Sequence, residues 1–255
     1  MIKSFVNNDR PIIIGMLKSI TMSDLLNEIK LVLSQGVDAF GFQIDRLVPQ
    51  ERNAKNYKIL FAAMQGKPAY VTNYIRGNAL ELDDEELTRE LLLAVECGAK
   101  LVDIRCDLFD RQPCEYTTDK KAIQKQMKVI RKIKDMGAEV LMSAHVLKYI
   151  PCEEVLEIAY SQQARGVDVV KIVIDVNSEE ELRDALKTSV ILKEKLDVAS
   201  LFLCNGTHCE IHRMIGPLLG TDLFLTVENS TTGQTQPTIQ RAREQLALGG
   251  YTNLP

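Results

Sequence analysis

One lysine stands inside a strongly apolar stretch, and its surroundings suggest covalent chemistry. Lys171 lies within segment 166–175, whose other residues are mostly Val and Ile, as in a strand buried on both faces. Burial of an unpaired ammonium is costly and favours the neutral amine. A free amine in a pocket is the nucleophile that forms Schiff bases with ketones. Alternatively, the lysine could reach solvent at a strand end or pair with a carboxylate.

A histidine directly follows another apolar stretch, 140–143. His145 is one of three histidines in the chain, and an imidazole can both take and return a proton near neutral pH. Because its strand precedes that of Lys171 along the chain, we expect the two side chains to lie near each other. This position favours a proton-transfer role for His145 over a purely structural role as a polar residue at the end of a strand.

A loop after the seventh apolar stretch carries a competing possibility. Cys204, His208 and His212 are residue types that bind zinc, and three such ligands would leave an open position for catalysis. Their spacing matches no strong zinc signature, and Cys209 and His212 could equally flank a helix start. A metal-dependent isomerase or lyase is therefore a second hypothesis. A barrel that binds a small acid without catalysis is a third.

Strands and helices alternate along the whole chain. Predicted strands cover 11–17, 37–44, 69–74, 101–105, 140–143, 166–175, 198–204 and 223–227. Predicted helices run from Thr21 or Ser23 to Gly36 and over 54–64, 83–97, 120–136, 151–163, 178–196 and about 237–248. Such alternation predicts parallel strands with right-handed crossovers. Eight units in 255 residues predict an α/β fold, a single-domain (β/α)8 TIM barrel over residues 1–255.

Four helix-to-strand junctions repeat one another and support this architecture. Each places a glycine after the helix, then a small or polar residue, then an apolar strand; the glycines are Gly36, Gly98, Gly137 and Gly166. An open doubly wound sheet is the alternative fold. No glycine-rich phosphate-binding motif follows the first strand, which favours the barrel.

In a barrel of this kind the active site lies at the carboxyl ends of the strands. Polar residues at those ends are therefore candidates for the site. They are Gln43, Asp45, Thr72, Tyr74, Arg76, Arg105, Asp107, Ser143, His145 and Lys171, with segments 205–213 and 228–234.

The composition excludes several classes of protein. A net charge of −4 without a dense Lys/Arg block argues against nucleic-acid binding. No apolar run approaches the roughly 18 residues of a membrane helix, and the polar start of the chain is not a signal peptide. The six cysteines are irregularly spaced and mostly within apolar elements, as expected of reduced thiols. We expect a cytoplasmic protein.

Three motifs resemble those of the type I 3-dehydroquinate dehydratases of the shikimate pathway. Segment 142–145 resembles the family's M-S-x-H, and 168–172 resembles its D-x-x-K-I. Segment 205–220 is similar to its G-x-x-S-R-x-x-G-x-x-x-G, and 230–234 is a weaker match to its S-A-P-G-Q lid. The order and spacing of the motifs agree with the family over nearly the whole chain.

The resemblance implies a hydro-lyase of aromatic amino acid biosynthesis that converts 3-dehydroquinate to 3-dehydroshikimate. Lys171 would form the Schiff base, His145 would act as acid and base, and Arg213 would bind the substrate carboxylate. Ser230 and Gln234 would close over the substrate. The family's properties also imply a homodimer that needs neither a metal nor an organic cofactor.

The chain departs from the family at several site positions. Gly41 and Gln43 stand where the family's second strand has a glutamate and an arginine. On the third strand Tyr74 is an altered residue, Arg76 is displaced, and the glutamate that steadies the family's histidine is absent. His212 replaces a serine. We expect Gln43 and Arg76 to contact substrate, which is 3-dehydroquinate or a related keto acid.

Overall fold

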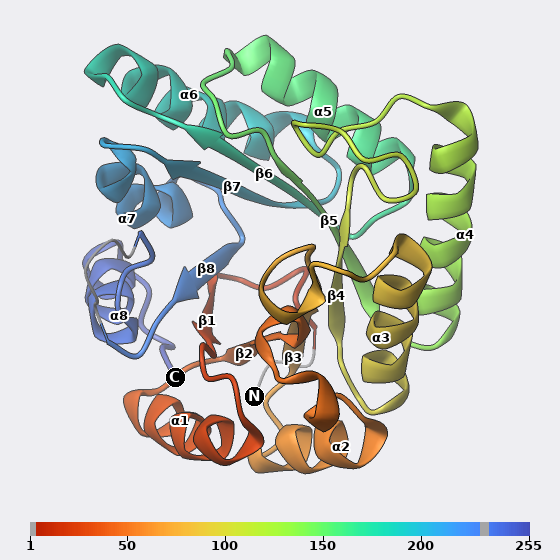
Figure 1. Cartoon of the computed structure of the whole chain (residues 1–255). Helices are drawn as coiled ribbons and strands as arrows, with labels where there is room; N and C mark the ends of the chain where they lie inside the picture. The colour runs from red at the N-terminus through yellow and green to blue at the C-terminus, as the bar shows by residue number, and fades with distance from the viewer. Residues whose placement is uncertain (1–3, 230–234) are drawn as a thin grey trace.

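The computed structural model describes residues 4–229 and 235–255 and has a ring of helices around a barrel of strands (Figure 1). The strands are β1 (Ile12–Met16), β2 (Ala39–Gln43), β3 (Ala69–Thr72), β4 (Leu101–Arg105), β5 (Glu139–His145), β6 (Val169–Asp175), β7 (Ala199–Asn205) and β8 (Leu223–Thr226). The helices are α1 (Met22–Gln35), α2 (Ala54–Ala63), α3 (Asp84–Glu96), α4 (Lys120–Asp135), α5 (Cys152–Ala164), α6 (Glu179–Lys195), α7 (Cys209–Leu219) and α8 (Ile239–Leu248). The predicted (β/α)8 barrel is confirmed.

The strands pair in parallel in the order β7-β6-β5-β4-β3-β2-β1-β8. The first and last strands of this order, β7 and β8, are joined by hydrogen bonds of Asp222, the residue just before β8. Its backbone N–H donates to Ser200 O at 2.9 Å, and its carboxylate accepts from the Ser200 N–H at 2.8 Å. All eight strands therefore direct their carboxyl ends to the same end of the barrel, where an active site is expected.

Among the described residues, α7 is the one α-helix that the sequence analysis missed. Its residues include Gly216 and Pro217, which disfavour a helix in sequence-based prediction. Pro217 lies inside the helix, two residues before its end, and Gly220 follows the helix with a φ of 126°. The helix is important for the site because it carries Arg213.

Side chains on each strand alternate between the barrel interior and the helices. On β6, Val169 and Val173 belong to the inner apolar cluster, whereas Ile172 packs in the outer cluster. Lys171 lies between the two valines and therefore points into the barrel. On β4 the same alternation directs Asp103 inward.

The repeated junctions have a common structural role. Gly166 follows α5 with a φ of 89°, a conformation that glycine adopts without steric cost. Two residues later the Asp168 carboxylate accepts from the backbone N–H of Val140 on the neighbouring strand at 2.8 Å. Asp38 binds the N–H of Ile13 in the same way at 3.0 Å. Asp168 thus has a structural role at the amino end of β6, although it belongs to the family-like motif.

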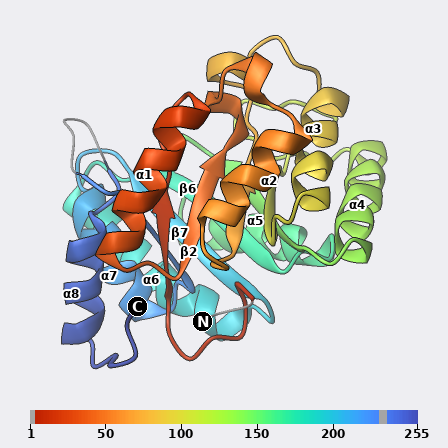
Figure 2. The same cartoon turned by 90° about the horizontal axis from the view of Figure 1, so that it is seen from below.

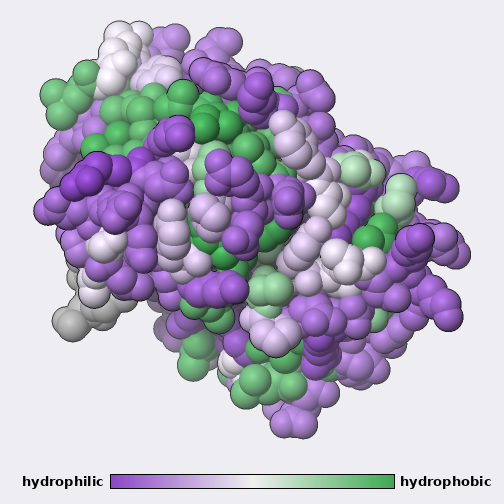
Figure 3. All heavy atoms as spheres, turned by 90° about the horizontal axis from the view of Figure 1, so that it is seen from above, coloured by the Kyte–Doolittle hydropathy of each residue, from purple (hydrophilic) through white to green (hydrophobic). Residues whose placement is uncertain are grey.

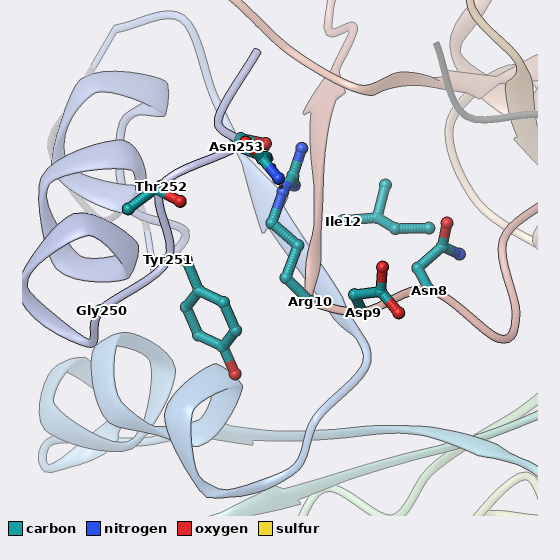
Figure 4. A pocket seen from close by; sticks show the side chains of 8 residues that line it. All are labelled: Asn8, Asp9, Arg10, Ile12, Gly250, Tyr251, Thr252 and Asn253. Atoms are coloured by element: carbon teal, nitrogen blue, oxygen red, sulfur yellow. Dashed lines mark hydrogen bonds between the residues drawn. The ribbon is translucent and has the colours of Figure 1, made fainter.

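Residues 8–12 and 250–253, near the two ends of the chain, lie at the same end of the barrel (Figure 2). There a pocket of about 310 Å³ lies between residues 8–12 and 250–253, with the side chains drawn in Figure 4. Its arginine, Arg10, forms an ion pair with Asp38 at 2.6 Å and donates to Asn253 O at 2.8 Å. Residues at this end of such barrels support stability, and the guanidinium is already paired. This pocket is therefore not the candidate active site.

Figure 3 shows the surface on the side of α5 and α6, where apolar residues gather within a mostly hydrophilic surface. Tyr160 of α5 and Val190 of α6 are among the exposed large apolar side chains of the chain. Within the described residues, no helix combines the length and the apolar character needed to cross a membrane.

Candidate active site

A pocket of about 200 Å³ opens at the carboxyl ends of the strands. Five of the residues that the sequence analysis assigned to the site line it: Gln43, Arg76, His145, Lys171 and Arg213. They come from four strands or the segments after them and from α7, so the barrel brings together residues spread over most of the chain. Thr72 and Tyr74, candidates by their strand-end position, line it as well. Ser230 and Gln234, expected to close over the substrate, lie outside the described residues.

The amine of Lys171 has three hydrogen-bond partners. It donates to the Tyr74 hydroxyl at 2.7 Å, to Asp103 Oδ2 at 3.0 Å and to the Tyr70 hydroxyl at 3.2 Å. The lysine and aspartate side chains are 5% and 0% exposed. The expectation of a lone buried amine is therefore wrong, because a buried carboxylate compensates the charge. The alternative in which the lysine pairs with a carboxylate is the one observed.

Asp103 is the centre of a buried cluster of hydrogen bonds beneath the pocket. Besides Lys171, it accepts from the hydroxyls of Tyr70 at 2.6 Å, of Ser143 at 2.6 Å and of Tyr74. Burial, and then the charge of Asp103, raise the pKa values of both tyrosines well above the ordinary value. Both phenols therefore keep their protons at neutral pH and act as donors to the carboxylate.

A glutamate from a different loop orients His145. Nδ1 of His145 lies 2.6 Å from Oε2 of Glu115, which lies between β4 and α4. A carboxylate at Nδ1 favours the tautomer with the proton on that atom and leaves Nε2 to accept a proton. Burial raises the pKa of Glu115, but the hydrogen bond and charge of His145 outweigh it and lower the pKa overall. The family position for this glutamate is altered, yet the histidine has a glutamate partner.

The loop that carries Glu115 is held by charged residues at the end of β4. Arg105 binds Asp107 at 2.9 Å and Asp84 at 3.0 Å, and Asp84 also accepts from the N–H of Phe109 at 2.8 Å. Glu115 itself has a φ of 49°, a left-handed conformation that costs roughly 1 kcal/mol or more for a residue other than glycine. Arg105 and Asp107, candidates in the sequence analysis, thus position the loop.

Arg213 is a buried cation without a carboxylate partner. Its guanidinium donates to Cys204 O and to Asn205 Oδ1, both at 2.7 Å, and the residue is 7% exposed. Among the described residues it forms no ion pair. Burial lowers its pKa, since no anion nearby offsets the loss of water. Such a guanidinium beside a pocket is well suited to bind an anionic ligand.

Arg76 lines the same pocket but differs from Arg213 in having a partner. Its Nε binds the buried Asp45 carboxylate at 2.7 Å, and its guanidinium lies 4.7 Å from the Tyr74 ring centre. Burial lowers the pKa of Arg76, but the charge of Asp45 outweighs it and raises the pKa overall. Its side chain is 49% exposed, so it lies at the pocket's rim.

The β1–β2 side of the pocket has fewer polar groups than the family pattern, with Gln43 as its polar residue. Met16 fills the space beside Gly41, since a Cβ atom there would lie 2.1 Å from the methionine sulfur. Leu203 and Leu225 also line the pocket. Gln43 pairs in register with Thr72, whose buried hydroxyl has no hydrogen-bond partner among the described residues.

The hypothesis of a metal site at Cys204, His208 and His212 is wrong. His212 is 0% exposed, and its Nε2 lies 3.0 Å from the Ser189 hydroxyl. Burial lowers its pKa to about 4, so it is a neutral core residue. In the part of the chain that the structure describes, no three His, Cys, Asp or Glu side chains are placed to hold a metal ion.

Three residues of the site were not found from the sequence: Tyr70, Asp103 and Glu115. Asp103 carried a usable signal, because it is an acidic residue inside a predicted buried strand. Tyr70 carried little signal, since tyrosine is common in strands. Glu115 carried none, because it lies in an irregular loop of 14 residues between β4 and α4 (106–119).

The sequence matches a family model, that of the type I 3-dehydroquinases, over residues 15–252. No curated protein sequence matches the chain.

Several solved structures resemble the chain closely in fold at low sequence identity. The 3-dehydroquinate dehydratase of Geobacillus kaustophilus has a TM-score of 0.82 at 19% identity, covering 97% of this chain and 95% of that one. The type I enzyme of Clostridium difficile, solved with covalently modified comenic acid, has a TM-score of 0.81 at 16% identity, covering 94% and 93%. The Enterococcus faecalis dehydratase has a TM-score of 0.79 at 17% identity, covering 97% and 99%.

Proposed function

Because this chain belongs to the type I 3-dehydroquinase family of hydro-lyases, we propose that it dehydrates 3-dehydroquinate to 3-dehydroshikimate through a Schiff base. The observation that carries the proposal is the joint position of Lys171, His145 and Arg213 around one pocket. These are a nucleophile, a proton carrier and an anion-binding group, which together suffice for dehydration of a keto acid.

In the proposed reaction Lys171 attacks the substrate ketone, and loss of water gives an iminium ion. The iminium withdraws electrons and acidifies the neighbouring carbon. His145 removes the proton from that carbon and returns it to the hydroxyl group that leaves. Hydrolysis of the imine then releases the product and restores the amine. No step requires a metal ion or an organic cofactor.

Arg213 positions the substrate for both proton transfers. A planar guanidinium binds a carboxylate through two parallel hydrogen bonds, which fixes the orientation of the ring. Gln43 and Arg76 are proposed as further contacts at the rim, and Ser230 and Gln234 as groups that close over the substrate. Gly41 and Met16 give the β1–β2 side fewer polar groups than the family pattern, so the proposal includes related keto acids as substrates.

The proposed setting is that of the family, with a biosynthetic enzyme in the cytoplasm that works as a homodimer. Sedimentation velocity of the purified chain would test the dimer, since a monomer and a dimer of 28.7 kDa subunits separate well.

Trapping of the imine tests the proposed function. The protein is incubated with 3-dehydroquinate and borohydride, which reduces an imine to a stable amine. We expect a covalent adduct on the peptide that carries Lys171, with the mass of substrate or product minus water plus two hydrogens. Lys171→Met should lose both the adduct and the activity.

Two results would change the proposal in different ways. An adduct with another keto acid, and none with 3-dehydroquinate, would keep the chemistry and replace the substrate. The absence of an adduct with every carbonyl compound tried would refute the Schiff-base mechanism. Circular dichroism of Lys171→Met would establish that the variant is folded.

A further inference from the structure

Tyr74 both lines the pocket and belongs to the buried Asp103 cluster, as do Tyr70 and Lys171. Its hydroxyl accepts from the Lys171 amine at 2.7 Å, the shortest of the three contacts of that amine. The same hydroxyl donates to Asp103. The Tyr74 ring also stands edge-on to the His145 ring, with centroids 5.2 Å apart and an interplanar angle of 88°.

Imine formation requires a proton carrier at the lysine nitrogen. The overall reaction joins an ammonium and a ketone to give an iminium and water. Both hydrogens of that water come from the nitrogen, and the charge stays at one positive unit on each side. A group beside the nitrogen must therefore accept protons from it and deliver them to the carbonyl oxygen.

His145 is not placed for this task in the described structure. Its Nδ1 is bound by Glu115, and no hydrogen bond joins it to Lys171 among the described residues. Tyr74 has the required contacts, since its hydroxyl accepts from the amine while its own proton is shared with a carboxylate. A proton can then pass from nitrogen to Asp103 through the phenol and return along the same path.

We propose that Tyr74 is a catalytic residue that carries protons between Lys171, Asp103 and the substrate's carbonyl oxygen. This inference rests on the Schiff-base mechanism proposed above. It divides the proton transfers between two residues, with His145 serving the substrate carbon and the leaving hydroxyl, and Tyr74 serving the nitrogen and the carbonyl oxygen.

Imine formation conserves atoms and charge. The ammonium loses a proton through Tyr74 to Asp103, and the nitrogen lone pair forms the bond to carbon while the carbonyl π pair moves to oxygen. Tyr74 protonates that oxygen as Asp103 returns its proton. The nitrogen gives up a second proton by the same path, and this proton goes to the hydroxyl, which leaves as water with the C–O electron pair. The nitrogen lone pair then completes the iminium, and Tyr74 and Asp103 regain their first states.

Tyr70 is the nearest comparison within the cluster. Its hydroxyl also donates to Asp103 and the residue also lines the pocket, but the hydroxyl lies 3.2 Å from the amine, against 2.7 Å for Tyr74. Tyr149 is a comparison outside the pocket, where its hydroxyl donates to Asp184 at 3.0 Å. Replacement of each tyrosine by phenylalanine removes one phenol–carboxylate hydrogen bond.

The rate of imine formation tests the inference. Each protein is mixed with 3-dehydroquinate, quenched with borohydride after increasing times, and analysed by intact mass. Tyr74→Phe should lower the limiting rate of adduct formation by on the order of 100-fold, the lower end of general acid–base effects. Tyr70→Phe should lower it less, and Tyr149→Phe should leave it unchanged. His145→Ala should still form the adduct but no longer turn over.

The outcomes separate this inference from the proposed function. An unchanged limiting rate in folded Tyr74→Phe, or a change confined to the half-saturating substrate concentration, would overturn the role of Tyr74 and leave the Schiff base intact. The absence of an adduct in the wild-type protein would overturn the proposed function itself. If Tyr74→Phe does not fold, 3-fluorotyrosine at position 74 keeps the shape and changes the acidity. An identical rate in that protein would then reject the inference.

Discussion

Nδ1 of His145 and Oε2 of Glu115 lie 2.6 Å apart, although the two residues are 30 positions apart in the sequence and come from different segments. The carboxylate sets the tautomer of the ring and stabilises the positive charge that forms when Nε2 takes a proton. The family pattern places this glutamate after the third strand, whereas here the loop after β4 provides it. A carboxylate at Nδ1 of the histidine is thus present, but it comes from a different place in the chain.

Glu115→Gln should lower kcat by roughly 10- to 100-fold, because a hydrogen bond to a charged group is worth about 1.5–3 kcal/mol. The amide keeps the size of the side chain but removes its charge. KM should change little, since Glu115 is not among the residues that line the pocket. Steady-state kinetics with 3-dehydroquinate measure both constants.

Glu153→Gln is the matched control for this prediction. Glu153 is exposed in the first turn of α5, the helix that follows the histidine's strand. Its replacement makes the same chemical change without touching His145. If the two variants had equal kcat values, Glu115 would have no part in the proton transfers.

Arg213→Lys should raise KM for the acid substrate by roughly 10- to 100-fold, although the charge is kept. Lysine offers a point charge and cannot reproduce the planar two-pronged contact with a carboxylate, nor the bonds to Cys204 O and Asn205. The measurement is KM for 3-dehydroquinate.

Arg241→Lys is the control for the arginine substitution. Arg241 is 55% exposed and binds Glu210 at 3.0 Å, outside the strand-end pocket. Its KM should equal that of the wild-type protein. Equal KM values for Arg213→Lys and Arg241→Lys would indicate that the substrate carboxylate is bound elsewhere in the pocket.

Substitutions of Lys171 and Asp103 should have strongly coupled effects on the free energy of unfolding. Lys171→Met leaves the buried carboxylate without its cation, a change that costs roughly 3–5 kcal/mol in comparable buried pairs. Asp103→Asn likewise leaves the buried ammonium of Lys171 without its carboxylate. The double variant should therefore lose less free energy of unfolding than the sum of the single variants, by roughly 0.5–3 kcal/mol. Urea unfolding of all four proteins measures this coupling, and strict additivity would contradict it.

The architecture was predictable because each unit of the chain carries its own local signals. The strand of Lys171 is an uninterrupted apolar run, and Gly166 before it ends the preceding helix. Signals of this kind depend on residues a few positions apart. Helix α7 escaped prediction because Gly216 and Pro217 lower helix propensity locally. Its formation depends on packing against β7 and α6, which local sequence does not report.

The pocket was predictable in part, for a related reason. Strand-end position indicated His145, since the barrel rule needs only the ends of predicted strands, and Lys171 stood out because it interrupts an apolar strand. The partners of these residues were not predictable in the same way. Asp103 is 68 residues before Lys171 and Glu115 is 30 before His145. Such pairs depend on the register of neighbouring strands and on the path of a loop, which become visible only in three dimensions.

His212 gives a prediction for stability as a function of pH. Its pKa is lowered from 6.5 to about 4 in the folded protein by burial. Between these two values the unfolded chain binds a proton at this residue and the folded chain does not. Stability therefore rises with pH across this window and falls as the pH is lowered through it. At about pH 5 the loss relative to neutral pH should be about 2 kcal/mol from this residue alone.

His212→Gln should remove that part of the pH dependence, because glutamine stays neutral at every pH. Carboxylates titrate in the same range but are common to both proteins, so their contribution cancels in the difference. Urea unfolding of the two proteins at about pH 7.5 and about pH 5 gives the four free energies that are needed. The wild-type protein should lose about 2 kcal/mol more than the variant on acidification. If both proteins lost the same amount, His212 would be protonated in the folded state, and its assignment as a neutral core residue bound to Ser189 would be wrong.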